Sequence, residues 1–355
     1  MGDLIRVLIL GTGQMGAGIA RLVLEKPGLE LAGAYARRAE RAGMDVGQAI
    51  GIAKDLGVAI EPDLTTAVKH TRPHIAIQAT CSKLEDAWPE ISIVLRHGVP
   101  IISIAEEMAY PACSSPAIAQ EMHDLARTEG VAALGTGINP GFVLDLLVIA
   151  MTGVCARIDS ITATRVNDLS PYGPSVLKAQ GIGLGPQAFA AGVESGTVAG
   201  HFGFPQSIRM IGSALGLNIG RIEEERRPIV SKVHRETAFV SVAPGQVAGC
   251  AHTATAYDGD KPIITLVHPQ QIRPELEGVE TGDTIEISGM PSFRFEARPE
   301  IPGGRGTIAI AVNMIPRVLN AAPGLLTMAD LPVPAAMMGD ARQFLHARAE
   351  ERHHG

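Results

Sequence analysis

The first apolar stretch of the chain leads directly into a glycine-rich turn. Residues 4–10 (LIRVLIL) are apolar apart from Arg6, and Gly11-Thr12-Gly13-Gln14-Met15-Gly16 follows at once. A continuous apolar run of this length predicts a buried parallel strand. Apolar residues then recur at helical spacing until Pro27-Gly28, which predicts a helix over the intervening residues. The pattern therefore predicts a strand, a tight turn and a helix in that order.

This order of elements gives each glycine a separate task. Gly11 lets the turn close, Gly13 lets a pyrophosphate approach bare backbone, and Gly16 lets the helix pack closely on the strand. The free N–H groups at the start of the helix favour an anion. We expect a dinucleotide site, whose turn is Gly11, Thr12, Gly13, Gln14, Met15 and Gly16. A glycine-rich turn without a ligand is the alternative.

The end of the second predicted strand indicates which dinucleotide binds. Residues 29–35 form that strand, and the adenosine ribose is expected at its far end, about 20 residues after the glycines. No carboxylate stands there: Ala36 is followed by Arg37 and Arg38. Arginine suits a 2′-phosphate, so the sequence predicts NADP as the preferred cofactor, with NAD also accepted. The alternative is that both arginines are ordinary loop charges.

The remaining pattern predicts two kinds of domain. Strands and helices alternate up to about residue 140, which is typical of a doubly wound parallel sheet. Beyond residue 153 the periodicity changes to short strands, at residues 158–166, 235–242, 250–257, 261–268 and 284–287. We predict that these form an antiparallel sheet with one exposed face. A helix is expected over residues 205–215, and the apolar residues 307–320 are expected to pack on the first domain.

The fold class is therefore α/β. Residues 1–140 are predicted to form a Rossmann NAD(P)-binding domain, and residues 141–305 an α+β domain for substrate binding and dimerisation. Residues 306–355 form a C-terminal segment that returns to the Rossmann domain. A length of 355 residues fits more than one core.

Net charge and composition exclude some classes of binding partner. The net charge is −7 and no basic stripe offsets it, which argues against nucleic acid as a partner. The apolar stretch 142–155 contains Asp145 and is too short to span a bilayer, so no membrane segment is expected. The chain enters its first strand almost at once, which leaves no room for a leader and favours a cytoplasmic location.

Metal ligands are not indicated. Cys81, Cys113, Cys155 and Cys250 are scattered without a CxxC pair, and the histidines contain no HExxH motif. We expect reduced thiols and no metal. His353-His354 at the end of the chain is predicted to be a tail rather than a metal site.

Glu106-Glu107 follows the predicted strand 99–104, at the sheet edge where the nicotinamide is expected. A carboxylate there can accept a proton from a substrate ammonium or activate water. Confinement beside an apolar ring should raise its pKa towards neutrality. The alternative is that the pair begins the next helix, where acidic residues complement the dipole. The pattern does not say which glutamate faces inward.

Other residues at strand ends are candidate ligands. Thr80 is expected beside the cofactor, and Asn139 lies in a second glycine-rich turn, residues 135–141. Asn139 could bond the nicotinamide carboxamide or the substrate, and the same turn could be a hinge between domains. The predicted substrate pocket contains Asn139, Phe142, Arg165, Asn167, His201 and Thr307, each of which could instead be structural.

Several long runs carry a family resemblance: AEEMAYP (105–111), GTGINPGFVLD (135–145), RVNDLSPYG (165–173), VAGHFGFPQS (198–207) and VNMIPRVLNAAPGLLTMADLPVP (312–334). They resemble 2,4-diaminopentanoate dehydrogenases and the native amine dehydrogenases grouped with them. The resemblance implies a dihydrodipicolinate-reductase-like fold, a homodimer, and NAD(P)-dependent oxidative deamination that can run in reverse as reductive amination. It also implies that the catalytic carboxylate is Glu106 or Glu107, and Glu106 has the shorter reach from the strand.

The leading hypothesis is thus an amine dehydrogenase that converts 2,4-diaminopentanoate or small alkyl amines to a ketone and ammonia. The substrate's carboxylate would need a cationic partner, for which Arg165 is the first candidate. Two alternatives stay open. One is an imine or enamine reductase of the dihydrodipicolinate type, and the other is a dinucleotide sensor without turnover.

Overall fold

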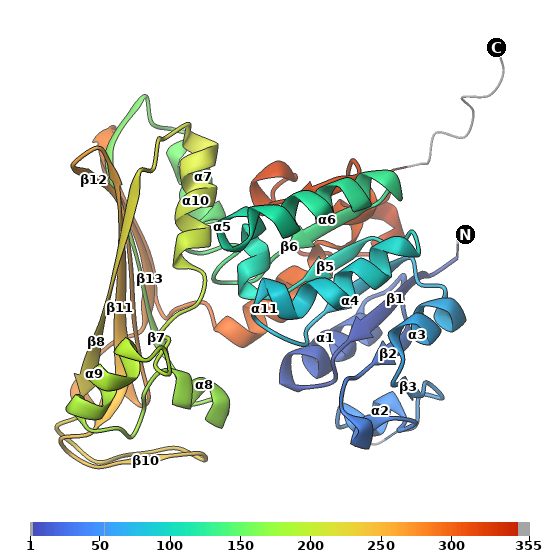
Figure 1. The fold of residues 1–355 in the computed structure, drawn as a ribbon, viewed down its shortest axis with the longest axis horizontal. Helices are drawn as coiled ribbons and strands as arrows, with labels where there is room; N and C mark the ends of the chain where they lie inside the picture. The colour runs from blue at the N-terminus through green and yellow to red at the C-terminus, as the bar shows by residue number, and fades with distance from the viewer. Residues whose placement is uncertain (1–2, 53, 347–355) are drawn as a thin grey trace. The chain divides into compact units, whose positions relative to one another are not determined.

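The computed structural model describes residues 3–52 and 54–346, which form two compact units (Figure 1). The first unit runs up to Gly141 and resumes at Gly303, and the second is Phe142–Pro302. The predicted tail at His353-His354 lies outside the described residues.

The first unit is built on a parallel sheet of seven strands in the order β15-β6-β5-β4-β1-β2-β3. This is the doubly wound arrangement that the alternating pattern predicts. The apolar runs form its central strands, whose side chains are almost fully buried. The strands are β1 (Ile5–Leu10), β2 (Leu29–Tyr35), β3 (Ile60–Glu61), β4 (Ile75–Gln78), β5 (Ile101–Ser103), β6 (Ala132–Gly135) and β15 (Gly324–Leu326).

Amphipathic helices cover this sheet. In α4, for example, Leu84, Ile91 and Leu95 lie on one buried face. The C-terminal segment supplies α11, which packs on α1 where Gly18 has no side chain: a Cβ there would lie 2.2 Å from Ile308 Cδ1. The helices are α1 (Gln14–Glu25), η1 (Ala39–Arg41), α2 (Val46–Ala49), α3 (Leu64–Thr71), α4 (Leu84–Arg96), η2 (Glu106–Ala109), α5 (Pro111–Ser114), α6 (Pro116–Thr128), α11 (Gly303–Asn313), α12 (Ile315–Leu319), η4 (Met328–Asp330) and η5 (Ala341–Phe344).

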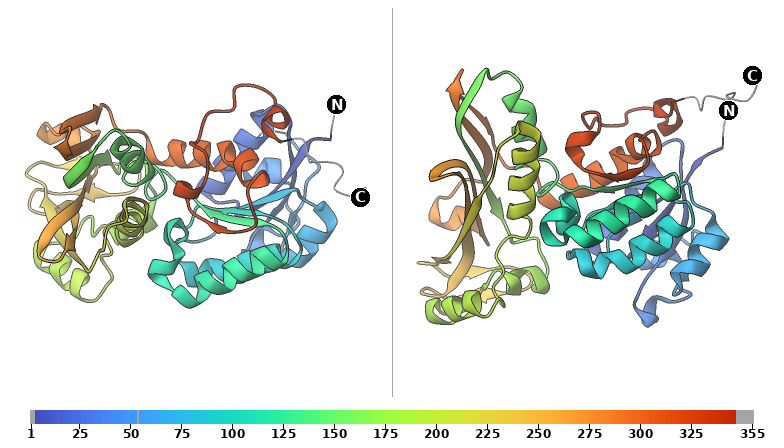
Figure 2. Two further views of the ribbon diagram at one scale, coloured as in Figure 1. Left: turned by 90° about the horizontal axis from the view of Figure 1, so that it is seen from above. Right: turned by 45° about the horizontal axis from the view of Figure 1, so that its top comes forward.

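The second unit contains a six-stranded sheet in the order β14-β13-β7-β12-β11-β8. Its strands are β7 (Arg157–Asp168), β8 (Arg221–Val230), β11 (Val247–Asp258), β12 (Lys261–Gln271), β13 (Gly282–Met290) and β14 (Phe293–Ala297). Helices α7 (Leu146–Thr152) and α10 (Phe204–Leu215) lie along one face (Figures 1 and 2). The short helices α8 (Pro174–Ala179), α9 (Pro186–Glu194) and η3 (Pro274–Glu277) complete the unit.

The expectation of a purely antiparallel sheet is wrong at one pairing. β12 runs parallel to β7, while the other neighbours are antiparallel. Alternation of buried and exposed residues is the same in both kinds of pair, so the sequence pattern does not separate them. Residues 235–242 were also expected to form one strand, and instead form the hairpin of β9 (Arg235–Glu236) and β10 (Ser241–Val242).

The backbone of η2 lies directly against the end of β6, and this contact requires glycine. A Cβ on Gly135 would lie 1.7 Å from the carbonyl oxygen of Met108. Because the obstacle is backbone rather than a flexible side chain, the η2 segment would have to move. Gly135 therefore fixes the height of η2, and with it Glu106 and Glu107, above the sheet.

We expect Gly135→Ala to destabilise the protein by about 3 kcal/mol, at the upper end of overpacking costs. Urea unfolding followed by circular dichroism measures the effect. Gly220→Ala is the matched control, because a Cβ there meets nothing within 4 Å. Equal stabilities of the two variants would contradict this role of Gly135.

Candidate dinucleotide and catalytic site

The glycine turn after β1 has the shape that a dinucleotide needs. Gly11 has φ +99°, and a Cβ on it would lie 2.6 Å from the carbonyl oxygen of Ala79. A Cβ on Gly16 would lie 1.9 Å from the carbonyl oxygen of Gly11, so helix α1 can approach the turn only with glycine there. A Cβ on Gly13 would meet nothing, which leaves its backbone open to a ligand.

The start of α1 is suited to an anion. Its N-cap is Gly13, no side chain caps it, and its first turn holds no acidic residue. The first N–H groups of the helix thus have neither a capping side chain nor a competing carboxylate. A pyrophosphate fits this turn, and Gly11 to Gly16 would hold it.

Glu107 has a structural partner. Its Oε2 accepts a hydrogen bond from the backbone N–H of Leu84 at 2.7 Å, at the first residue of α4. Its own backbone N–H donates to the carbonyl oxygen of Ser82 at 3.2 Å. Glu107 therefore ties η2 to the start of α4 and satisfies one of that helix's unpaired donors.

Glu106 is in a different environment. The residue is half-buried, and burial raises the pKa of its carboxyl group. The neighbouring charge of Glu107 raises it further, while hydrogen bonds from its own backbone and from the Ser82 side chain oppose the rise. Of the two glutamates, Glu106 thus has the raised pKa that suits a general base, and Glu107 has the structural contacts.

The second glycine-rich turn and the C-terminal segment meet within the first unit. The Oγ1 of Thr307, in α11, accepts a hydrogen bond from the backbone N–H of Ile138 at 3.1 Å. A Cβ on Gly137 would lie 2.7 Å from the carbonyl oxygen of Pro140, so the turn is tightly closed. The structure therefore brings two predicted site residues, Asn139 and Thr307, to the same turn, although 168 residues separate them.

The two predicted phosphate-binding arginines differ in their contacts. Arg37 Nε donates to Glu90 Oε1 at 2.6 Å, and its Nη2 donates to the carbonyl oxygen of Asp86 at 2.7 Å. Arg38 is exposed, and no carboxylate pairs with it within residues 3–52 and 54–346. Glu90 also accepts from Thr80 Oγ1 at 2.5 Å. The sequence analysis missed Glu90, although a glutamate on the apolar face of α4 was a signal of a buried partner.

In the second unit, Arg165 already has an acidic partner. Its Nη1 donates to Asp283 Oδ1 at 2.6 Å and its Nη2 donates to the carbonyl oxygen of Ile301, with both charged side chains almost fully buried. The two residues face each other across β7 and β13. Arg165, the first candidate partner for a substrate carboxylate, is therefore already balanced by Asp283, through a strand register that the sequence does not display.

Asn167 and His201 lie in a buried cluster with two histidines that the sequence analysis missed. His268 Nε2 lies 3.0 Å from Asn167 Oδ1, and the rings of His201 and His268 are 4.8 Å apart. His252 accepts from the backbone N–H of His201 and lies 3.0 Å from Glu224. Burial lowers the pKa of His201 to about 3 and also lowers those of His252 and His268. The cluster is therefore neutral at physiological pH.

Phe142, the first residue of this unit, is half-buried.

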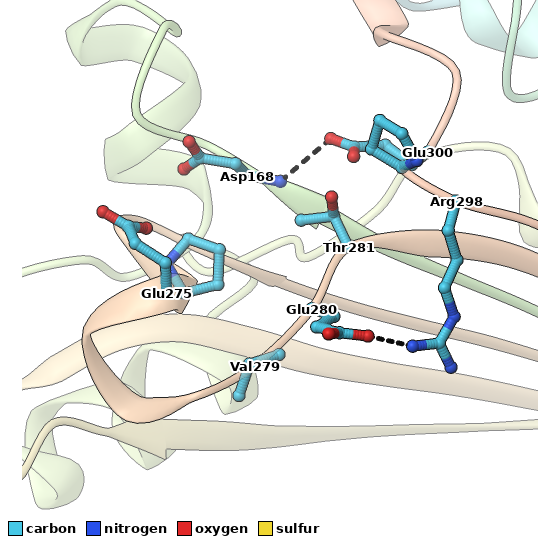
Figure 3. A pocket seen from close by; sticks show the side chains of 9 residues that line it. Asp168, Glu275, Val279, Glu280, Thr281, Arg298 and Glu300 are labelled. Atoms are coloured by element: carbon cyan, nitrogen blue, oxygen red, sulfur yellow. Dashed lines mark hydrogen bonds and ion pairs between the residues drawn. The ribbon is translucent and has the colours of Figure 1, made fainter.

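An open pocket of the second unit is lined by other residues (Figure 3). Its wall carries the carboxylates of Asp168, Glu275, Glu280 and Glu300, with Arg298 paired to Glu280. Of the residues at the end of β7 that could meet substrate, only Asp168 lines it, and Arg165 and Asn167 do not. Asp168 Oδ1 already accepts hydrogen bonds from Ser170 and from the backbone of Arg273. We do not assign the catalytic chemistry to this pocket.

Other kinds of site are not found in the part of the chain that the structure describes. No group of three or more His, Cys, Asp or Glu residues there could hold a metal ion. The four cysteines are free thiols. Among the same residues, no helix is long and apolar enough to cross a membrane.

The parallel sheet, the glycine turn and the glutamate at the strand end define a nicotinamide-dinucleotide-dependent oxidoreductase. Comparison with known families agrees: residues 5–103 match the N-terminal domain of dihydrodipicolinate reductase, and residues 142–347 match the 2,4-diaminopentanoate dehydrogenase C-terminal domain. The chain belongs to the 2,4-diaminopentanoate dehydrogenase family.

Individual relatives support this assignment. The chain is 43% identical to a 2,4-diaminopentanoate dehydrogenase of Acetoanaerobium sticklandii, over 98% of both chains. It is 25% identical to an amine dehydrogenase of Streptomyces virginiae, over 94% of this chain and 98% of that one. An amine dehydrogenase structure from Mycobacterium smegmatis aligns with a TM-score of 0.84 at 27% identity, covering 94% of this chain and 98% of that one.

The raised pKa of Glu106 predicts a pH-dependent stability. Because its pKa in the folded state lies above the ordinary 4.5, the folded state binds more protons than the unfolded chain just above that pH. Ionisation of Glu106 therefore costs stability as the pH rises through this window. We expect Glu106→Gln to be more stable than wild type, with a larger difference at pH 8 than at pH 5.

Urea unfolding at the two pH values measures this difference. Glu30→Gln, on an exposed position of β2, is the control and should show no such trend. A Glu106→Gln variant whose stability tracks wild type at both pH values would contradict the raised pKa.

Proposed function

We propose that the chain catalyses reversible oxidative deamination of an amine. Amine, water and oxidised cofactor give ketone, ammonia and reduced cofactor, and the reverse reaction is reductive amination. The single observation that carries this proposal is a half-buried carboxylate with a raised pKa, Glu106, at the end of β5 in a nicotinamide-dinucleotide fold. The proposed substrates are 2,4-diaminopentanoate, the compound in the name of the 43% identical relative, and small alkyl amines.

Glu106 is the proposed base. A substrate ammonium has no lone pair, so hydride cannot leave the adjacent carbon until nitrogen loses a proton. Glu106 accepts that proton, and a raised pKa keeps it a base of useful strength near neutral pH. The oxidised nicotinamide, when bound, supplies the hydride acceptor. The resulting iminium is then hydrolysed: Glu106 first releases its proton to solvent, then takes a proton from the water that adds to the carbon and passes it to the nitrogen as ammonia leaves.

Glu107 and the glycine contact at Gly135 act as positioning features. Glu107 accepts the hydrogen bond from Leu84 N, so we assign to it the task of holding η2 against α4 rather than that of the base. The residues proposed to contact substrate in the second unit are Phe142, Arg165, Asn167 and His201. Since His201 is neutral and Arg165 is paired with Asp283, they offer hydrogen bonds and an apolar surface rather than an unbalanced charge. Asn139 and Thr307 are proposed to contact the nicotinamide side of the site.

The two alternatives are less well supported. A non-catalytic sensor has no use for a carboxylate with a raised pKa at the sheet edge. An imine or enamine reductase of the dihydrodipicolinate type would share the first unit, but the second unit matches the 2,4-diaminopentanoate dehydrogenase domain. NADP as the preferred cofactor, with NAD accepted, and a cytoplasmic location remain our predictions.

Reductive amination tests the proposed function. We expect consumption of NADPH or NADH to depend on both a ketone and ammonia, followed at the nicotinamide absorbance band with a panel of small ketones and 2-amino-4-oxopentanoate. Glu106→Gln should lower kcat by 10²–10⁴-fold, the usual contribution of a general base, while dinucleotide binding persists.

Glu107→Ala is the matched variant for this test. It should lose about 1 kcal/mol of stability, as for other lost helix caps, and keep far more activity than Glu106→Gln. Reduced-cofactor consumption without any requirement for ammonia would overturn the amine dehydrogenase assignment. Full activity of Glu106→Gln would overturn the assignment of the base.

We also propose that the chain forms a homodimer through the second unit. One face of its sheet carries a flat, half-buried set of small side chains in register: Thr162 and Thr164 of β7, Thr265 and Val267 of β12, and Thr253 and Thr255 of β11. The opposite face holds buried residues such as Ala254 and Leu266, against which α10 packs. Charged residues of both signs flank the flat set, on β8 and β14, so a second copy can meet it without net repulsion.

Thr255→Arg tests the dimer, because it places a charge in the middle of the flat face. Sedimentation equilibrium should give twice the 37.2 kDa chain mass for wild type and a single chain mass for the variant. Glu40→Arg, at an exposed position of η1, serves as the control and should remain dimeric. A wild-type monomer, or a variant that dimerises as tightly as wild type, would contradict this interface.

A further inference from the structure

We propose that Glu90 determines the balance between NADP and NAD by neutralising Arg37. This inference rests on the proposed nicotinamide-dinucleotide dependence and concerns the choice between the two forms. It assigns a positioning role to a residue of α4 that lies far along the chain from the β2 end, where dinucleotide specificity is usually set.

The contact between Arg37 and Glu90 is closely defined. Arg37 Nε donates to Glu90 Oε1 at 2.6 Å, and Arg37 Nη2 donates to the carbonyl oxygen of Asp86, one turn earlier in α4. The Glu90 side chain is 6% exposed, whereas that of Arg37 is 41% exposed. The guanidinium group is thus anchored on the buried carboxylate while part of it still faces solvent.

Glu90 is itself fixed by a chain of hydrogen bonds along the sheet edge. Its second oxygen accepts from Thr80 Oγ1 at 2.5 Å, and Thr80 Oγ1 accepts from Gln78 Nε2 at 2.6 Å. Gln78 accepts in turn from Ser103, and both of these side chains are fully buried. The carboxylate therefore has little freedom to turn away from Arg37.

The number of charges at the end of β2 explains why the position of the Glu90 carboxylate affects the choice of cofactor. Enzymes that prefer NAD place a carboxylate at the end of β2 for the ribose hydroxyl, and those that prefer NADP place an arginine for the 2′-phosphate. Here the chain has Arg37 and Arg38 and no carboxylate in sequence, yet Glu90 supplies one in space. Glu40 and Arg41 of η1 bring opposite charges that cancel. Arg37, Arg38 and Glu90 together thus carry one net positive charge, that of Arg38, rather than the two of the arginine pair alone.

Glu90 acts through Arg37 and not on the ligand itself. Both of its oxygens already have donors, and the residue is only 5% exposed. One net positive charge gives a moderate preference for the 2′-phosphate and leaves NAD usable. Removing the Glu90 charge frees the Arg37 charge and raises the preference for the phosphate-bearing cofactor.

Binding of the two reduced cofactors tests this directly, without turnover. Titrations of wild type, Glu90→Gln, and the double variant Arg37→Gln/Glu90→Gln with NADPH and NADH, followed by nicotinamide fluorescence, give the ratio of the two affinities. Glu90→Gln should raise the ratio in favour of NADPH by about tenfold, the effect of one additional nearby charge at the protein surface. The double variant has the same net charge as wild type, so its ratio should lie within about twofold of the wild-type value.

The titrations distinguish a failure of the role proposed for Glu90 from a failure of the proposed function. An unchanged ratio in Glu90→Gln, or a parallel loss of both affinities, overturns the role of Glu90 and leaves the proposed function standing. A double variant that loses NADPH affinity selectively shows that Arg37 binds the phosphate itself, and this result also overturns the role proposed for Glu90. The double variant provides this test even if Glu90→Gln alone does not fold, as judged by circular dichroism. Wild-type protein that binds neither dinucleotide refutes the proposed function instead.

Discussion

The site depends on the contact between η2 and the end of β6. Because Gly135 has no side chain, the backbone of Met108 rests directly on the strand, and Glu107 ties the same segment to the first residue of α4. These two constraints act on the two residues that follow Glu106 and fix its height above the sheet. One glutamate of the pair is used as a structural tie, and its neighbour, the proposed base, lies in surroundings that raise its pKa.

Charge balance is the second principle of the structure. Arg37 is paired with Glu90 in the first unit, and Arg165 is paired with Asp283 in the second. His201 and His268, which lie near Arg165, are neutral, because their burial lowers the pKa of each. An unpaired buried charge is costly, and Arg37 and Arg165, two of the three arginines expected to meet a ligand, already have a carboxylate partner, whereas the exposed Arg38 has none among the described residues. If the proposed pocket binds the amine there, these side chains offer hydrogen bonds and shape rather than a free charge.

The sequence predicted those features that depend on neighbours along the chain. The glycine turn, the parallel strands of the first unit and the position of Glu106-Glu107 at a strand end follow from local periodicity and turn chemistry. The partners of Arg37 and Arg165 did not follow, because they lie 53 and 118 residues away and depend on helix and strand register. The charged strand β8 was missed for a related reason: its run of glutamates and arginines gives no apolar alternation, and only its pairing with β11 makes it a strand.

We propose Glu106 as a base whose pKa is raised by its surroundings. The most direct measurement is a ¹³C NMR titration of protein labelled at the glutamate carboxyl carbons, with Glu106→Gln identifying the resonance. We expect a pKa for Glu106 clearly above the ordinary 4.5, with its resonance titrating apart from those of the exposed glutamates in the same spectra. A Glu106 resonance that titrates together with the exposed glutamates would contradict it.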